Sequence, residues 1–173
     1  AAGFGEASIK HDKERYEHKY EYCDLLITGS GPSGLASAYA AAKNGARVIL
    51  AEDKPRFGGS LLTSDVNIGN QTGVEWTEKI IAELKSMPNV TVKNRSQVFG
   101  YYDHNMLVMS ERISDHLPKT QKYLPKQRLW YIRANEVLIS SGSIERPLVF
   151  GNNDTPGVMS VSYTHLRAHE TGI

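Results

Sequence analysis

The sequence predicts an α/β fold in which helices cover a parallel sheet, with a small antiparallel β-meander added. Three observations support this class. Apolar segments of strand length alternate with helical segments, the first strand runs directly into a glycine-rich turn, and no internal repeat indicates another architecture. The 173-residue chain is about one domain long, and its 40% hydrophobic and 23% charged residues are ordinary for a globular protein.

The first compact unit begins at Cys23, where an apolar strand leads into G-x-G-x-x-G and then into an alanine-rich helix over 35–43. In this setting Gly29 permits the tight turn, Gly31 lets the backbone approach a pyrophosphate, and Gly34 lets helix and strand pack closely. The helix N-terminus favours the phosphates. The motif therefore predicts a Rossmann-like FAD/NAD(P)-binding fold.

The next strand, over 46–51, leads into Glu52 at about the expected distance of 20 or so residues from the motif. A carboxylate here accepts hydrogen bonds from a ribose diol and repels a 2′-phosphate, which favours NAD or FAD over NADP. Lys54 and Arg56 oppose this reading, because a nearby cation could accommodate that phosphate. Ser60 follows a pair of glycines closely enough to bring a hydroxyl to the nucleotide, or to cap the turn.

The later elements complete a β-α-β-α-β order followed by a meander. A helix ending before Pro88 carries one apolar stripe, and a short strand over 90–92 follows it. The expected meander strands are 98–102, 106–109 and 129–132, and a buried strand over 136–140 returns to the parallel sheet.

Composition excludes several functions. The 20 basic and 19 acidic residues are interspersed, so no nucleic acid or anionic membrane is expected as a partner. No apolar stretch approaches the ~20 residues of a membrane span, and cytoplasm is the default location. The single cysteine rules out a C-x-x-C pair and predicts a partly buried, inert thiol. No catalytic residue is predicted, and electron-transfer chemistry would come from a cofactor.

Several polar loop segments carry a more specific signal than the glycine motif. Together with 16–18 and 23–26 they resemble the alpha subunit of heterotetrameric sarcosine oxidase over roughly 1–159, and the later segments concerned are 102–105, 115–118, 127–134, 144–150 and 153–159. The resemblance implies a complex that oxidises sarcosine to glycine with oxygen, gives hydrogen peroxide and passes the one-carbon unit to tetrahydrofolate. This segment alone would be inactive and would need the other subunits.

The resemblance also implies a noncovalent NAD in this domain, with FAD and a covalent FMN elsewhere or at a subunit interface. Carried over by position, the family's nucleotide contacts fall on Ser33, Glu52, Asp53, Lys54, Ser60 and Val98. The family usually has Asp-Glu-Arg at 52–54 and Ala-Thr-Gly at 140–142, and the residues here keep the sign of charge or the small size.

The expected boundaries are a linker or the end of an upstream domain over 1–22, a partial dinucleotide-binding domain over 23–160, incomplete at its C-terminus, and a non-native tail over 161–173. The tail departs abruptly from the family and has few aliphatic residues. His165 and His169 in it have the spacing of a metal pair, but no third ligand is evident, so no metal site is expected.

Two other functions fit the same residues. One is a related FAD-dependent oxidoreductase that acts on opines or other secondary amines, of which this chain would form one subunit. The other is a noncatalytic domain that holds a dinucleotide and scaffolds its partner subunits. NAD and FAD present the same adenosine diphosphate to Gly31 and Glu52, so these residues alone do not distinguish the two cofactors.

Overall fold

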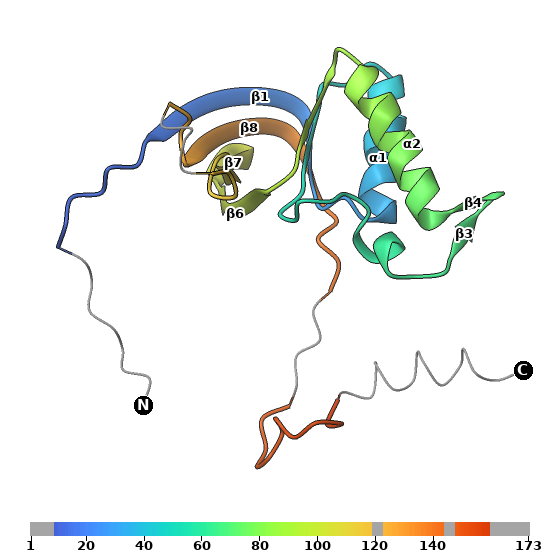
Figure 1. Ribbon diagram of the computed structural model, residues 1–173. Coiled ribbons are helices and arrows are strands. Elements are labelled where there is room, and N and C mark those ends of the chain that lie inside the picture. The colour runs from blue at the N-terminus through green and yellow to red at the C-terminus, as the bar shows by residue number, and fades with distance from the viewer. Residues whose placement is uncertain (1–8, 119–122, 144–147, 160–173) are drawn as a thin grey trace, which may run out of the picture. The chain divides into compact units, whose positions relative to one another are not determined.

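The computed structural model describes residues 9–118, 123–143 and 148–159 (Figure 1). Two short 3₁₀ turns, η1 and η2, accompany its helices and strands. In chain order the elements are β1 (Tyr16–Thr28), α1 (Pro32–Lys43), β2 (Val48–Ala51), η1 (Gly59–Leu62), β3 (Asn67–Ile68), β4 (Gln71–Thr72), α2 (Gly73–Ser86), β5 (Val90–Lys93), β6 (Ser96–Tyr102), η2 (Asp103–Asn105), β7 (Met106–Arg112) and β8 (Gln127–Ile139).

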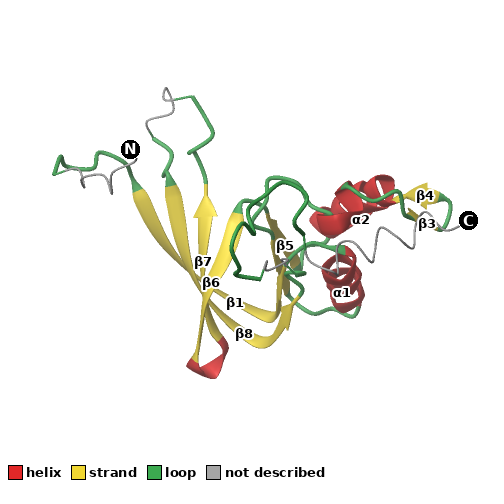
Figure 2. Ribbon diagram, turned by 90° about the horizontal axis from the view of Figure 1, so that it is seen from below, coloured by secondary structure: helices red, strands yellow, loops and turns green. Residues whose placement is uncertain are grey.

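Six strands form one sheet in the order β5-β2-β1-β8-β7-β6. The first four are parallel to one another, and β7 and β6 continue the sheet as antiparallel strands. Figure 2 shows α1 and α2 together on one side of the strands. The predicted α/β class, with a parallel sheet and an antiparallel meander, is confirmed. A separate hairpin of β3 and β4 leads into α2.

The two strands expected over 129–132 and 136–140 are a single strand, β8, so this part of the prediction is wrong. The connecting residues contain no glycine or proline that would force a turn. Ala134 is buried in the core, and its backbone is paired with Cys23 of β1. Asn135, a common turn residue, instead donates a side-chain hydrogen bond to Asp24 (3.2 Å).

The first strand starts earlier than the expected boundary at Cys23. β1 begins at Tyr16, and its early residues pair in register with β8 from Gln127 onward. Alternating polar and aromatic residues conceal this part of the strand, because most of these side chains are exposed. These residues belong to the strand because they pair with β8, and the local sequence does not reveal that pairing.

Two apolar clusters cover the two faces of the sheet. Leu35 of α1 and Leu84 of α2 pack with Ile27 and Leu50 on the helix side. α2 starts with a capping box, in which Thr72 and Glu75 satisfy each other's backbone amides. Neighbouring strand residues such as Leu26 point the other way. There they form the second apolar cluster, together with residues of β7 and β8. The alternation of side chains along each strand thus fixes both cores.

The sheet curls so that strands far apart in its order come together. Figure 1 shows β1 and β8 as long curved strands bending around β7 and β6. Lys93, on edge strand β5, forms an ion pair with Glu111 of β7 (3.3 Å). Glu111 also accepts a hydrogen bond from the indole of Trp130 (2.6 Å). This link closes the sheet around the second apolar cluster.

The chain divides into two compact units between Ser141 and Gly142, and every strand and helix named above belongs to the first. In the second unit the described residues form short turns, where the Asn153 side chain donates to the Leu148 carbonyl (2.9 Å). The expected tail over 161–173, including His165 and His169, lies outside the described residues. Within the described part, no helix has the length and apolarity that crossing a bilayer requires.

Cys23 is expected to resist thiol reagents in the folded protein. Burial, helped by the carboxylates of Asp24 and Glu21, raises the pKa of its thiol from 9.0 to about 12. Labelling at pH 8 with a thiol reagent should therefore be slow in buffer and fast in denaturant. Because the unfolded thiol ionises near 9 and the folded one near 12, stability should fall as the pH rises above 9. Rapid labelling of the native chain would contradict this.

Candidate dinucleotide-binding site

The glycine motif forms the turn between β1 and α1, and two of its glycines are required by packing. Gly29 has a φ of +96°, and a Cβ there would overlap the carbonyl oxygen of Ser140, just after β8. A Cβ at Gly34 would overlap the carbonyl oxygen of Gly29. Helix α1 therefore lies against the turn at a distance that only glycine allows.

Gly31 differs from these two positions. It precedes α1 with φ −67° and ψ −179°, a conformation open to any residue, and a Cβ there would meet no atom within 4 Å. No side chain caps α1, and its first turn holds no acidic residue. Ser33 is exposed in that turn. The space beside the helix N-terminus thus fits an anionic group such as a pyrophosphate.

Glu52 lies directly after β2, and only 7% of it is exposed. Its Oε2 accepts hydrogen bonds from the backbone amide (2.9 Å) and the hydroxyl (2.5 Å) of Ser30. Its Oε1 accepts from the Lys54 amide (2.9 Å). The structure therefore brings the predicted acid against the glycine motif, as binding of a single nucleotide by both would require.

Asp53 and Lys54 follow Glu52 in a loop that is hydrogen-bonded to β7 and to the residue before β6. Their side chains form an exposed ion pair (3.4 Å). Arg112, at the end of β7, donates to the Asp53 carbonyl (2.6 Å), and the Arg95 amide donates to the Lys54 carbonyl (3.1 Å). Because the Lys54 side chain is 74% exposed, this ion pair is weak and leaves the cation accessible.

The paired glycines that precede Ser60 pack against the glycine motif. The Gly58 amide donates to the Ser30 carbonyl (3.0 Å), and a Cβ at Gly59 would lie 2.9 Å from the Gly31 Cα. Ser60 itself is exposed at the start of η1. The structure thus places this turn beside the motif.

Val98 lies on β6 at an irregularity in the pairing with β7, and it packs against the second apolar cluster. β6 starts next to Glu52, because the Ser96 amide donates to the Glu52 carbonyl (2.8 Å). Val98 is therefore on an element joined to the end of β2, while its side chain takes part in the core.

Sequence reasoning missed Ser30, Arg95 and Arg112. Ser30 is fully buried between two motif glycines, and its bonding to Glu52 is not apparent from spacing. Arg95 has a φ of +52°, unusual for a residue with a side chain, and pairs with Asp115 (2.7 Å). No local pattern identifies these two arginines as supports of the loop after β2.

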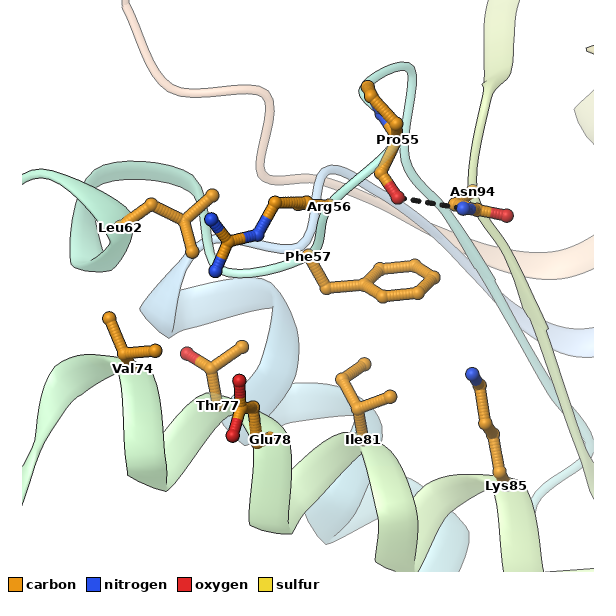
Figure 3. A pocket seen from close by; sticks show the side chains of 10 residues that line it. All are labelled: Pro55, Arg56, Phe57, Leu62, Val74, Thr77, Glu78, Ile81, Lys85 and Asn94. Carbon is orange, nitrogen blue, oxygen red and sulfur yellow. Dashed lines mark hydrogen bonds between the residues drawn. The ribbon is translucent and has the colours of Figure 1, made fainter. Parts of the chain in front are cut away.

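A cavity of about 280 Å³ lies between residues 55–57 and α2 (Figure 3). Arg56, Glu78 and Lys85 place both signs of charge on its wall, around the ring of Phe57. None of the predicted nucleotide-binding residues lines it. Arg56, the second cation that the sequence offered to a 2′-phosphate, lines this cavity, whereas Glu52 does not.

Comparisons with known proteins give a consistent family. A family model described as FAD dependent oxidoreductase matches residues 24–86. The alpha subunit of sarcosine oxidase from Rhizobium meliloti is 45% identical over 159 residues, which are 92% of this chain and 16% of that protein. An opine oxidase subunit from Agrobacterium tumefaciens is 24% identical over 88% of this chain and 30% of that protein. The chain thus spans a small part of the length of these relatives.

Among solved structures, L-proline dehydrogenase from P. horikoshii aligns with a TM-score of 0.61. The alignment covers 82% of this chain and 27% of that one, at 22% identity. At this identity the likeness concerns the fold alone. It agrees with the parallel sheet and meander described above.

Proposed function

We propose that this chain, which belongs to the family of sarcosine oxidase alpha subunits, forms the NAD-binding domain of such a subunit. The observation that carries this proposal is the open position beside Gly31, at a helix N-terminus that no side chain caps. Glu52 accepts a hydrogen bond from the backbone amide of Ser30, in the same loop. A pyrophosphate and a ribose joined in one ligand satisfy both features.

The residues proposed for the nucleotide site come from the glycine motif, the loop after β2, the turn after the paired glycines and β6. The motif contributes backbone and small side chains, and the loop after β2 contributes the acid and its neighbours. The complete set is Gly29, Gly31, Ser33, Gly34, Glu52, Asp53, Lys54, Ser60 and Val98. Within it Gly29 and Gly34 act by permitting the turn, because their Cβ positions are filled by backbone.

The proposed activity is flavin-dependent oxidation of sarcosine by a complex to which this chain contributes one subunit. In the assembled heterotetramer, bound FAD and FMN would supply the electron-transfer chemistry. The reaction would give hydrogen peroxide, and the one-carbon unit would be transferred to tetrahydrofolate. A sarcosine oxidase subunit and an opine oxidase subunit of Rhizobium meliloti are 45% and 44% identical to this chain, but the first match covers 92% of the chain and the second 74%. The longer match is the support for sarcosine over an opine. Turnover of sarcosine and opines by the assembled complex separates these substrates.

A scaffold role predicts a different result in the same complex. If this domain only held a dinucleotide structurally, emptying the site would leave turnover unchanged while the complex stayed assembled. Loss of turnover under those conditions supports a catalytic contribution.

We expect the chain to bind NAD more tightly than NADP by about 1–3 kcal/mol, because a 2′-phosphate removes a hydrogen bond to Glu52 and adds repulsion. The difference corresponds to roughly 5- to 150-fold in Kd. Calorimetric titration with NAD, NADP and FAD measures it, and we expect NAD to bind most tightly. Glu52→Gln should narrow the gap between NAD and NADP.

Glu136→Gln is the matched control, because it makes the same change at an exposed position on β8. It should leave both affinities unchanged. Equal affinities of the unaltered chain for NAD and NADP would show that Glu52 does not select the nucleotide.

A further inference from the structure

Ser30 connects three parts of the site that come from different segments of the chain. It is fully buried, and its hydroxyl donates to Glu52 Oε2 (2.5 Å) and accepts from the Gly58 amide (3.2 Å). The Ser30 backbone repeats both links, through its amide to Glu52 (2.9 Å) and its carbonyl to Gly58 (3.0 Å). One side chain therefore joins the glycine motif, the acid after β2 and the turn of paired glycines.

The two oxygens of Glu52 accept different numbers of hydrogen bonds. A carboxylate has about four acceptor sites, two on each oxygen. Oε2 already receives two donors from Ser30, while Oε1 receives one, from the Lys54 amide. Spare acceptor capacity for a sugar hydroxyl is therefore concentrated on Oε1, and it suffices for one hydroxyl.

We propose that Ser30 is a positioning residue: its hydroxyl fixes the Glu52 carboxylate so that Glu52 accepts one adenosine ribose hydroxyl through Oε1, and it holds the turn at Gly58 to the same acid. The inference rests on the proposed nucleotide-binding function. It adds that the acid reads a single hydroxyl rather than the whole diol. Ser30 does this without contacting the ligand through its own side chain, which is occupied by Glu52 and Gly58.

The first test is calorimetric titration of the full chain with NAD and with its adenosine 2′-deoxy and 3′-deoxy analogues. The 2′-deoxy analogue should bind roughly tenfold more weakly than NAD, because the expected preference over NADP requires Glu52 to accept the 2′-hydroxyl, and the 3′-deoxy analogue should bind within about twofold of NAD. Ser30→Ala should weaken NAD roughly tenfold and leave the weak-binding analogue within about twofold of its affinity for the unaltered chain. Adding Ser30→Ala to Glu52→Gln should cause no further loss.

Ser114→Ala is the matched control, because it removes a part-buried serine hydroxyl bonded to the Pro125 carbonyl, far along the chain from the motif. It should leave all affinities unchanged. If Ser30→Ala weakened NAD and both analogues equally, Ser30 would have only a general structural role. Unchanged NAD binding in Ser30→Ala would likewise overturn the inference.

The second test needs no ligand. Hydrogen exchange of the Gly58 amide should become modestly faster in Ser30→Ala and stay unchanged in Ser114→Ala, because only the first removes one of the two acceptors of that amide and leaves the Ser30 carbonyl. An unchanged Gly58 rate would show that the carbonyl alone holds the turn, and it would overturn the link through the hydroxyl. If the unaltered chain failed to bind NAD, the proposed function would fall, whereas this exchange measurement would still decide the role of Ser30.

Discussion

Gly34→Ala is expected to lower the free energy of unfolding by about 3 kcal/mol, the upper part of the range for overpacking a filled site. The new Cβ would overlap the Gly29 carbonyl oxygen, which belongs to the backbone of a tight turn and cannot rotate away. Either α1 moves off the sheet or the turn between β1 and α1 is distorted. Thermal unfolding should shift down by roughly 10 °C.

The sign of this effect is diagnostic, because alanine is the better helix former by about 1 kcal/mol. If propensity alone mattered, Gly34→Ala would stabilise the first turn of α1. Gly151→Ala provides the control, since a Cβ at Gly151 would meet no atom within 4 Å. A raised melting temperature for Gly34→Ala would show that α1 does not approach the turn as closely as described.

Gly31→Val should have the opposite profile, with folding retained and nucleotide binding lost. The backbone at Gly31 is extended and suits any residue, including one that precedes proline. Its side chain would extend into the open space where the pyrophosphate is proposed to lie. Steric exclusion of about 3 kcal/mol corresponds to roughly a hundredfold weaker binding of NAD or more.

Calorimetry with NAD measures this loss, and thermal unfolding checks that the variant is folded. Gly31→Ala should give a smaller loss in the same direction, and Gly151→Ala should bind as the unaltered chain does. NAD affinity unaffected by valine at position 31 would place the phosphates elsewhere. The contrast between positions 31 and 34 separates the glycine that serves the ligand from the one that serves the fold.

Local patterns predicted most of the parallel half of the fold. The helix expected over 35–43 is the main part of α1, and the strand expected over 90–92 is most of β5. In both cases the signal is contained in the segment, as apolar periodicity bounded by glycine or proline. The β3–β4 hairpin was missed, because its two-residue strands have no such periodicity.

The errors concern features set by distant partners. Whether the chain bends after Ile132 or continues as a strand depends on β1, more than a hundred residues earlier, which pairs with Arg133 and Ala134. In the same way, Glu52 was identified from its place after a strand, but its bond to Ser30 depends on how two strand ends lie in space. Spacing identifies the functional acid, while the groups that orient it are visible only in three dimensions.

The parallel pairing of β1 with β8 has a consequence for how the chain folds. Contacts across it, such as that between Glu17 and Arg128, join residues 111 apart in the sequence. During synthesis at about 5–20 residues per second, this edge of β1 would wait roughly 6–22 seconds for its partner to emerge. Pairing over such a separation also makes folding slow and exposes an unpaired edge to aggregation. The nascent protein is therefore most vulnerable in the interval before Gln127–Ile139 leaves the ribosome, when chaperone protection of β1 matters most.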